Sequence, residues 1–137
     1  MKPTKNEFNA LLRSDLTSFI QKCFHTINPG TLYLHNWHIE VIAWHLQQCH
    51  EGRIKRLIIT LPPRSLKSII TSVALPAWLL GLDPTQEIIV ASYAQNLTDK
   101  HALDCRAIME STWYQDCFPH TRIHRDKNAV TEFMTTQ

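Results

Sequence analysis

The chain has 137 residues, 44% of them hydrophobic and 19% charged, which is typical of one compact domain and argues against a disordered tail. Lysine and arginine number 14 against 12 acidic residues, and a formal net charge of +2 is too small to indicate nucleic-acid binding by itself. No apolar run approaches the roughly 20 residues needed to span a bilayer, and the first residues lack the apolar segment of a secretory leader.

Two helices are predicted in the first 52 residues. Thr4 and Glu7 form a capping-box pattern, and apolar residues then recur at three- and four-residue steps from 8 to 24, which predicts one amphipathic helix. The sequence NPG ends it. Asn36 is the expected N-cap of a second helix, and Gly52 marks its end.

The next segments alternate between strand and helix patterns. Residues 57–61 and 87–92 are short, β-branched and almost continuously apolar, which is typical of strands buried on both faces of a parallel sheet. Residues 68–80 between them predict a helix, which Pro76 is expected to kink or split. This order favours a right-handed α/β crossover.

The last third of the chain continues the alternation. Ser92 and Gln95 form a second capping-box pattern at the start of a helix predicted to run to about Glu110. Residues 126–128 predict a turn, and residues 130–134 a strand.

The cysteines and histidines give no cluster. The four cysteines are widely spaced without a C-x-x-C pair, which favours buried thiols in a reducing, cytosolic compartment. No histidine belongs to an H-E-x-x-H motif or to a Cys/His cluster with ligand spacing, so we expect no structural metal site.

The loop between the first predicted strand and the next helix resembles part of a phosphate-binding loop. The pattern G-x-x-x-x-G-K-[ST] can be laid over LPPRSLKS at residues 61–68, with the last two positions matched and both glycines missing. Lys67 would reach the outer phosphates and the Ser68 hydroxyl would hold Mg²⁺. Leu66 occupies a glycine position, so its side chain must turn away for the amides of residues 64–68 to approach an anion.

Basic residues gather around this loop. They create either a positive field for an anion or a solvated rim. The cluster consists of Arg53, Lys55, Arg56, Arg64 and Lys67, with Glu51 as the only acid among them.

Several separated blocks resemble the N-terminal ATPase region of tailed-phage terminase large subunits. They are NWHIEVIAWHLQQCHEGRIKRLIITLPPRSLKS, SVALPAWLLGLDP, IIVASYAQNLTDKHALDCRAIMESTWYQDCFPHTRI and DKNAVTEFMTT, and the resemblance covers residues 30–137. It implies an α/β fold with a P-loop NTPase-like parallel sheet and flanking helices, incomplete, preceded by N-terminal helices. Residues 1–52 would form those helices and residues 53–137 the first part of the ATPase core, in one partial domain at 1–137 without the nuclease domain.

The resemblance also implies a function and partners. Family members hydrolyse ATP to drive double-stranded DNA into a preformed capsid, together with a portal and a small terminase subunit, in the cytoplasm of the bacterial host. It assigns catalytic roles to Lys67 and Arg64, with Arg64 near the γ-phosphate, and the Mg²⁺-binding hydroxyl to Ser68. The implied ATP-binding residues are Arg64, Ser65, Leu66, Lys67 and Ser68 in the loop, and Trp37 and His38, which would pack on adenine.

The sequence departs from this family at its C-terminal end. No Asp-Glu pair follows an apolar strand, although a motor of this kind needs one to hold Mg²⁺ and activate water. We therefore expect a truncated fragment that binds ATP weakly, does not turn it over alone, and exposes apolar strand edges that favour self-association.

Two other functions are compatible with the same residues. The chain could be a non-enzymatic remnant or interaction domain that binds DNA or a partner subunit through its N-terminal helices and basic loop. It could also be another P-loop enzyme, such as a helicase-like ATPase or a small-molecule kinase.

Overall fold

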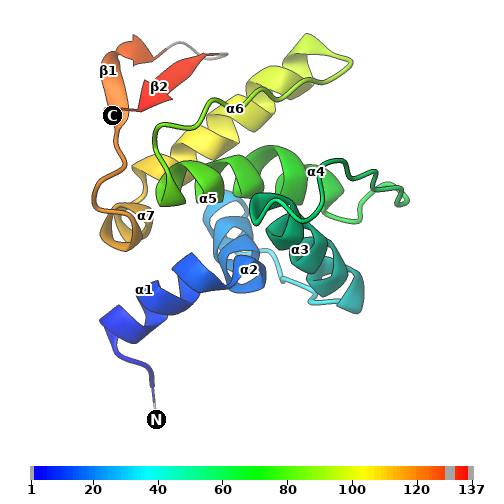
Figure 1. Cartoon of the computed structure of the whole chain (residues 1–137), viewed down its shortest axis with the longest axis horizontal. Helices are drawn as coiled ribbons and strands as arrows, with labels where there is room; N and C mark the ends of the chain where they lie inside the picture. The colour runs from blue at the N-terminus through cyan, green and yellow to red at the C-terminus, as the bar shows by residue number, and fades with distance from the viewer. Residues whose placement is uncertain (1, 129–131, 136–137) are drawn as a thin grey trace.

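Helices dominate the computed structural model, which describes residues 2–128 and 132–135 (Figure 1). In chain order the helices are α1 (Lys5–Ser14), α2 (Leu16–Ile27), α3 (Trp37–His50), α4 (Lys67–Ile69), the π-helical turn η1 (Ile70–Ala74), α5 (Leu75–Leu82), α6 (Gln95–Glu110) and α7 (Thr112–Cys117). Strands β1 (Ile123–Asn128) and β2 (Phe133–Thr135) pair antiparallel.

Helix α2 lies at the centre of the core. It packs against α1, α3, α5, η1 and α6, and the side chains of Phe19 and Ile20 are completely buried (Figure 1). The Phe19 ring makes edge-on contacts with Trp113, Tyr114 and Phe118 at centroid distances of 5.6, 6.3 and 6.1 Å. Such pairs add about 0.5–1.5 kcal/mol each beyond burial, so this cluster holds α7 and the residue after it against α2.

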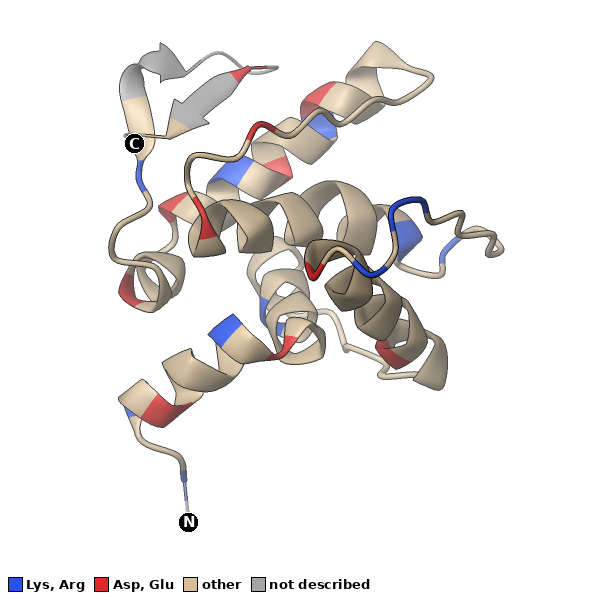
Figure 2. Cartoon of the chain, viewed as in Figure 1, with Lys and Arg blue, Asp and Glu red and all other residues tan. Residues whose placement is uncertain are grey.

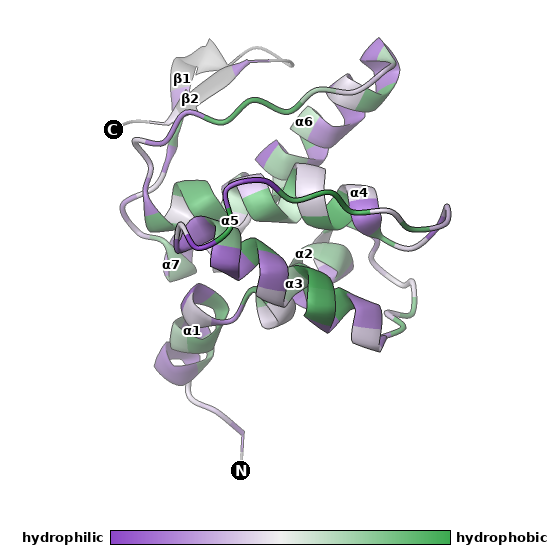
Figure 3. Ribbon diagram, turned by 45° about the vertical axis from the view of Figure 1, so that its right-hand side comes forward, coloured by the Kyte–Doolittle hydropathy of each residue, from purple (hydrophilic) through white to green (hydrophobic). Residues whose placement is uncertain are grey.

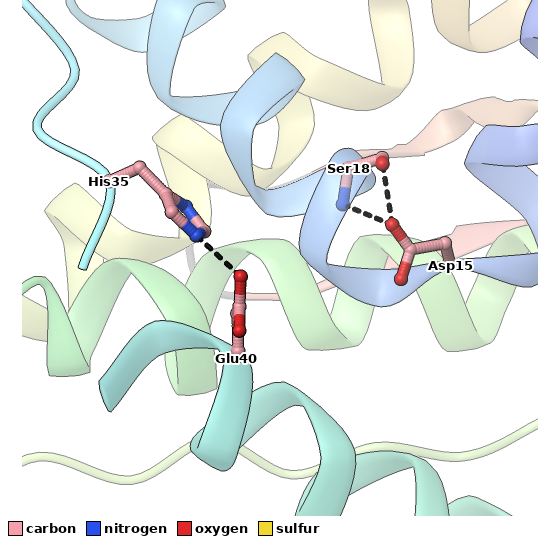
Figure 4. A network of polar contacts seen from close by, with 4 residues as sticks. All are labelled: Asp15, Ser18, His35 and Glu40. Carbon is pink, nitrogen blue, oxygen red and sulfur yellow. Dashed lines mark hydrogen bonds and ion pairs between the residues drawn. The ribbon is translucent and has the colours of Figure 1, made fainter. Parts of the chain in front are cut away.

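The single helix predicted over residues 8–24 is wrong, because two helices meet at Asp15. Asp15 has an extended backbone (φ −122°, ψ 105°), and its carboxylate accepts hydrogen bonds from the Ser18 amide at 2.9 Å and from the Ser18 hydroxyl (Figure 4). The apolar spacing continues across the break because Leu12 and Leu16 both face the core. The capping box predicted at Thr4 is confirmed.

Helices α4, η1 and α5 form one continuous helical rod from residue 67 to residue 82, close to the predicted 68–80. The helix is not split at Pro76 as one form of the prediction had it; instead, the π-helical turn η1 ends two residues before Pro76. Pro76 has no amide hydrogen to donate to the preceding turn, and π turns are one way in which helices absorb such a gap. Near the other end of the rod, the Phe118 ring lies 2.7 Å from the position where a side chain on Gly81 would place its Cβ.

The predicted P-loop NTPase-like parallel sheet is wrong for the described residues. Residues 57–61 and 87–92 have no strand assignment, and the strands that the structure describes form only the antiparallel β1–β2 pair. The β-branched composition specified an extended backbone, but a strand also needs a hydrogen-bonded neighbour, which these segments lack. The predicted burial on both faces is also wrong, because Leu57 and Ile59 pack on the core whereas Ile58 is exposed.

Several local predictions near the helix ends and the C-terminus need smaller corrections. Helix α6 has Ala94, not Ser92, at its N-cap, without a side-chain cap, and Asn36 is the N-cap of α3 but donates and accepts no capping bond through its side chain. The turn predicted at 126–128 lies within β1. In the strand predicted at 130–134, residues 130 and 131 lie outside the described residues, and the last two belong to β2.

Candidate nucleotide site

The loop between residues 61 and 68 has an unusual backbone. Arg64 and Leu66 both have φ of 63°, the left-handed region that glycine normally occupies, and Leu66 is the N-cap of α4 with ψ of 5°. Each such residue costs about 1–2 kcal/mol. Left-handed residues at alternate positions turn successive amide groups toward one point, the arrangement called a nest that binds anions. Leu66 therefore adopts, without glycine, a conformation that glycine favours at the motif's second glycine position, and Arg64 adopts it at a position that the motif leaves open.

The amides of this loop are free to donate. Among the described residues, no backbone or side-chain group accepts a hydrogen bond from the amides of residues 64–69. The carbonyl of the N-cap residue Leu66 accepts the first helical hydrogen bond, from the Ile70 amide at 3.0 Å. Free amides at the positive end of a 16-residue helical rod favour a negatively charged ligand.

The Leu66 side chain does not block the loop. It is partly buried and packs against the hydrophobic core. The sequence made this leucine the main objection to a phosphate site, because a side chain at the glycine position would obstruct the anion. The left-handed backbone resolves the objection by directing the side chain inward.

Lys67 and Ser65 fasten the loop internally. The Lys67 ammonium donates to the Leu61 carbonyl at 3.2 Å, and the Ser65 hydroxyl donates to the Pro62 carbonyl at 2.8 Å. The Lys67 side chain thus bends back from the end of the loop to its beginning. A phosphate that replaced the Leu61 carbonyl as its partner would meet a full negative charge, which makes a stronger hydrogen bond than a neutral carbonyl does.

Helix α3 supplies the second part of the site. The His38 ring nitrogen Nε2 donates to the Ser65 carbonyl at 3.1 Å, so the structure brings together two predicted residues that are 27 positions apart in the sequence. Trp37 is 71% exposed beside it. Both border a groove of about 290 Å³ between α3 and the extended segment 57–61.

The groove adds residues that the sequence motif did not indicate. Val41, Ile42 and His45 come from the following turns of α3. The others come from the extended segment that leads into the loop, namely Leu57, Ile58, Ile59, Thr60 and Leu61. No local pattern marks them, because they belong to two elements whose contact is set by the tertiary fold. The helical spacing of residues 37, 41 and 45 was the one available signal.

Arg64 and Ser68 are exposed, and neither side chain has a hydrogen-bond or ion-pair partner among the described residues. Figure 2 shows that the connection from α3 to α4 carries lysine and arginine residues with little acidic colour. Arg53 is one of these cations that already has an anionic partner, since its guanidinium pairs with the Glu51 carboxylate at 3.2 Å. The remaining cations can therefore interact with an added anion.

Other chemically reactive groups are not gathered here. Cys23, Cys105 and Cys117 are buried free thiols, as predicted, and Cys49 is half-buried and also free. Burial raises the pKa of Cys105 to about 12 and that of Cys117 to about 11, which keeps both protonated and poorly nucleophilic. Within residues 2–128 and 132–135, no group of three or more His, Cys, Asp or Glu side chains is placed to hold a metal ion.

Comparison with known proteins adds no assignment. No family model matches the sequence, and neither a curated protein nor a solved structure does so. Helices long and apolar enough to cross a membrane are absent from the described part of the chain.

Proposed function

We propose that the loop at residues 61–68 binds the phosphates of ATP with Mg²⁺, and that the chain is an ATP-binding fragment of a phage DNA-packaging terminase motor. The observation that carries the nucleotide proposal is the pair of left-handed residues, Arg64 and Leu66, ahead of free amides at the start of a helical rod. A non-glycine residue rarely adopts this conformation without a reason, and anion binding supplies one.

The side chains around the loop have complementary roles in this proposal. Lys67 would exchange the Leu61 carbonyl for the outer phosphates, the Ser68 hydroxyl would hold Mg²⁺, and the exposed Arg64 guanidinium would neutralise charge at the γ-phosphate. Mg²⁺ commonly keeps several water molecules and few protein ligands when it accompanies phosphates. A single hydroxyl is therefore a sufficient protein contribution.

The groove beside the loop provides a place for the base and sugar. Trp37 offers an exposed indole face, and His38 joins the groove to the loop through the Ser65 carbonyl. Stacking of a base on such a face contributes about 1–3 kcal/mol. ATP would then lie from the groove to the start of α4.

The motor assignment depends on the resemblance of the blocks that flank the loop to terminase ATPase regions. We extend it to double-stranded DNA, portal and small terminase subunit as partners, and to the cytoplasm of the bacterial host as location. The sequence has no Asp-Glu pair after an apolar segment, so we propose that the chain alone binds ATP without appreciable hydrolysis.

Titration of the purified chain with Mg-ATP by calorimetry tests the nucleotide proposal. Lys67→Ala should weaken binding at least about tenfold, because a hydrogen bond between charged groups contributes about 1.5–3 kcal/mol. Lys55→Ala is the matched control, since it removes a nearby exposed lysine outside the loop and should change affinity much less. Absence of Mg-ATP binding, or equal weakening by both variants, would refute a specific phosphate site.

A second candidate function is a nucleotide-independent interaction domain for DNA or a partner subunit. It is favoured by the exposed Trp37 and Trp44 on α3, 71% and 58% exposed, next to the basic connection. In the same titration series this alternative predicts binding of duplex DNA that is salt-sensitive, equal with and without Mg-ATP, and unchanged by Lys67→Ala.

A further inference from the structure

Two extended segments have unpaired backbones. No amide or carbonyl in residues 55–60 or 87–93 makes a hydrogen bond to another described residue. Both are hydrophobic coil that leads into a helix, the first into α4 and the second into α6 (Figure 3). An extended chain with a free row of donors and acceptors is a template for another strand.

The side chains of both segments alternate as they do in a strand with one buried face. Ile59 packs against the core while Ile58 is 91% exposed, and in the second segment Ile89 is 94% exposed between the half-buried Ile88 and Val90. Each exposed row therefore has an isoleucine at its centre, Ile58 between Arg56 and Thr60 in the first segment and Ile89 between Glu87 and Ala91 in the second. Neither row has a proline or an inward-pointing charge to prevent pairing.

The segments do not pair with each other within the chain. Residues 57–61 border α3, whereas residues 84–90 border α5 and α6. A strand partner for either segment would therefore come from outside the chain that carries it.

Charge selects the partner. When residues 56–61 (RLIITL) are aligned in parallel with residues 87–92 (EIIVAS), Arg56 stands opposite Glu87 and Ile58 stands opposite Ile89. Parallel pairing of the first segment with its own copy would place Arg56 opposite Arg56, which is unfavourable. Antiparallel pairing of the two segments would place Arg56 opposite Ser92, with no charge contact.

Both charges are available for such a contact. Arg56 and Glu87 are exposed, and neither forms an ion pair within residues 2–128 and 132–135. Each copy of the chain carries one basic and one acidic segment of matching length and hydrophobic pattern. A second copy is thus complementary to the first.

We propose that copies of this chain associate by parallel strand pairing of residues 56–61 of one copy with residues 87–92 of another, in the register that joins Arg56 to Glu87. The contact uses two different surfaces, so it forms a closed ring or twofold pair where the geometry closes and a longer assembly where it does not. It shares Leu61 with the nucleotide loop and residues 57–61 with the groove beside α3, but none of the residues 64–68.

A charge exchange measured by sedimentation velocity over a wide concentration range tests the proposal. For the unsubstituted chain, the average mass of the sedimenting species should increase as the protein concentration is raised. Arg56→Glu and Glu87→Arg should each raise the dissociation constant about tenfold, since each replaces an attractive cross-strand pair with a repulsive one. The double variant, and an equimolar mixture of the two single variants, should both recover association, because both restore opposite charges across the contact.

Two controls define the remaining outcomes. Lys2→Glu makes the same charge change as Arg56→Glu at an exposed position away from both segments and should leave association unchanged; circular dichroism verifies that every variant is folded. Ser68→Ala removes the hydroxyl proposed to hold Mg²⁺, contacts neither segment and should also leave association unchanged, so failure of the nucleotide proposal and failure of this one are distinguishable. A monomer at all concentrations, a monomer that instead captures an added extended peptide, or association indifferent to the charge exchange would overturn the proposal.

Discussion

Arg64 holds a backbone conformation that costs free energy unless the residue is glycine, and its exposed side chain has no hydrogen-bond or ion-pair partner among residues 2–128 and 132–135 that would offset the cost. Arg64→Gly and Arg64→Ala both remove the guanidinium, but only glycine relieves the left-handed strain. After allowance for the extra freedom of glycine in the unfolded chain, the glycine variant should be more stable than the alanine variant by about 0.5–1 kcal/mol.

Urea denaturation of the two Arg64 variants measures this difference, and alanine serves as the matched control for loss of the side chain. Equal stabilities would show that residue 64 does not hold a positive φ in solution. That result would also remove the main support for the nest of amides.

At single positions, the sequence predicted which residues form the loop better than it predicted how they form it. Lys67 and Ser68 were identifiable from the motif, and the structure places both at the start of a helix. The contact between His38 and Ser65 was not identifiable, because it joins two elements through tertiary packing. The inward turn of Leu66 depends on a backbone angle that its own side chain disfavours, so propensity alone argues against it.

At the scale of elements, the break between α1 and α2 depends on one side chain. Asp15→Ala removes the acceptor for the Ser18 amide and should lower the free energy of unfolding by about 1 kcal/mol, the usual contribution of an N-cap. Asp15→Asn keeps an oxygen acceptor in the same place and should retain most of the stability. Chemical denaturation followed by circular dichroism distinguishes the variants, and equal loss in both would assign the effect to charge.

Helices were predicted more accurately than strands for a physical reason. A helix satisfies its hydrogen bonds within its own segment, so the patterns around Trp37 and Lys67 located α3 and the 67–82 rod to within about two residues, the usual uncertainty of helix ends. A strand needs a partner whose position no local pattern specifies. The segments around Ile58 and Ile89 thus have strand-like alternation without a sheet. The break at Asp15 was missed because apolar spacing continues through it.

At the scale of the whole molecule, the end of the rod and the segment after α7 meet at one close contact. Gly81 faces the buried ring of Phe118, which is 3% exposed and cannot move away without disturbing its contacts with Phe19 and Tyr114. Gly81→Ala should therefore destabilise the fold by about 1–3 kcal/mol, the usual cost of overpacking, even though alanine is the better helix former.

A double-mutant cycle with Phe118→Leu tests this explanation. Leucine is smaller than phenylalanine, so the added cost of Gly81→Ala should be smaller in the Phe118→Leu background, with a coupling free energy of about 0.5–3 kcal/mol. Additive effects of the two substitutions in thermal unfolding would mean that the ring is not what limits residue 81.

Two of the four tryptophans of this chain are exposed, one is half-buried and one is buried. Trp37 and Trp44 project from α3 into solvent, whereas the indole N–H groups of Trp78 and Trp113 donate to the Leu12 carbonyl and the Thr26 hydroxyl. Their intrinsic emission accordingly contains a red-shifted component that iodide can quench and a blue-shifted component that iodide reaches poorly. Ligand binding in the groove beside α3 can therefore be followed through the exposed tryptophans, and unfolding of the core through the less exposed ones, in the same sample and without an attached dye.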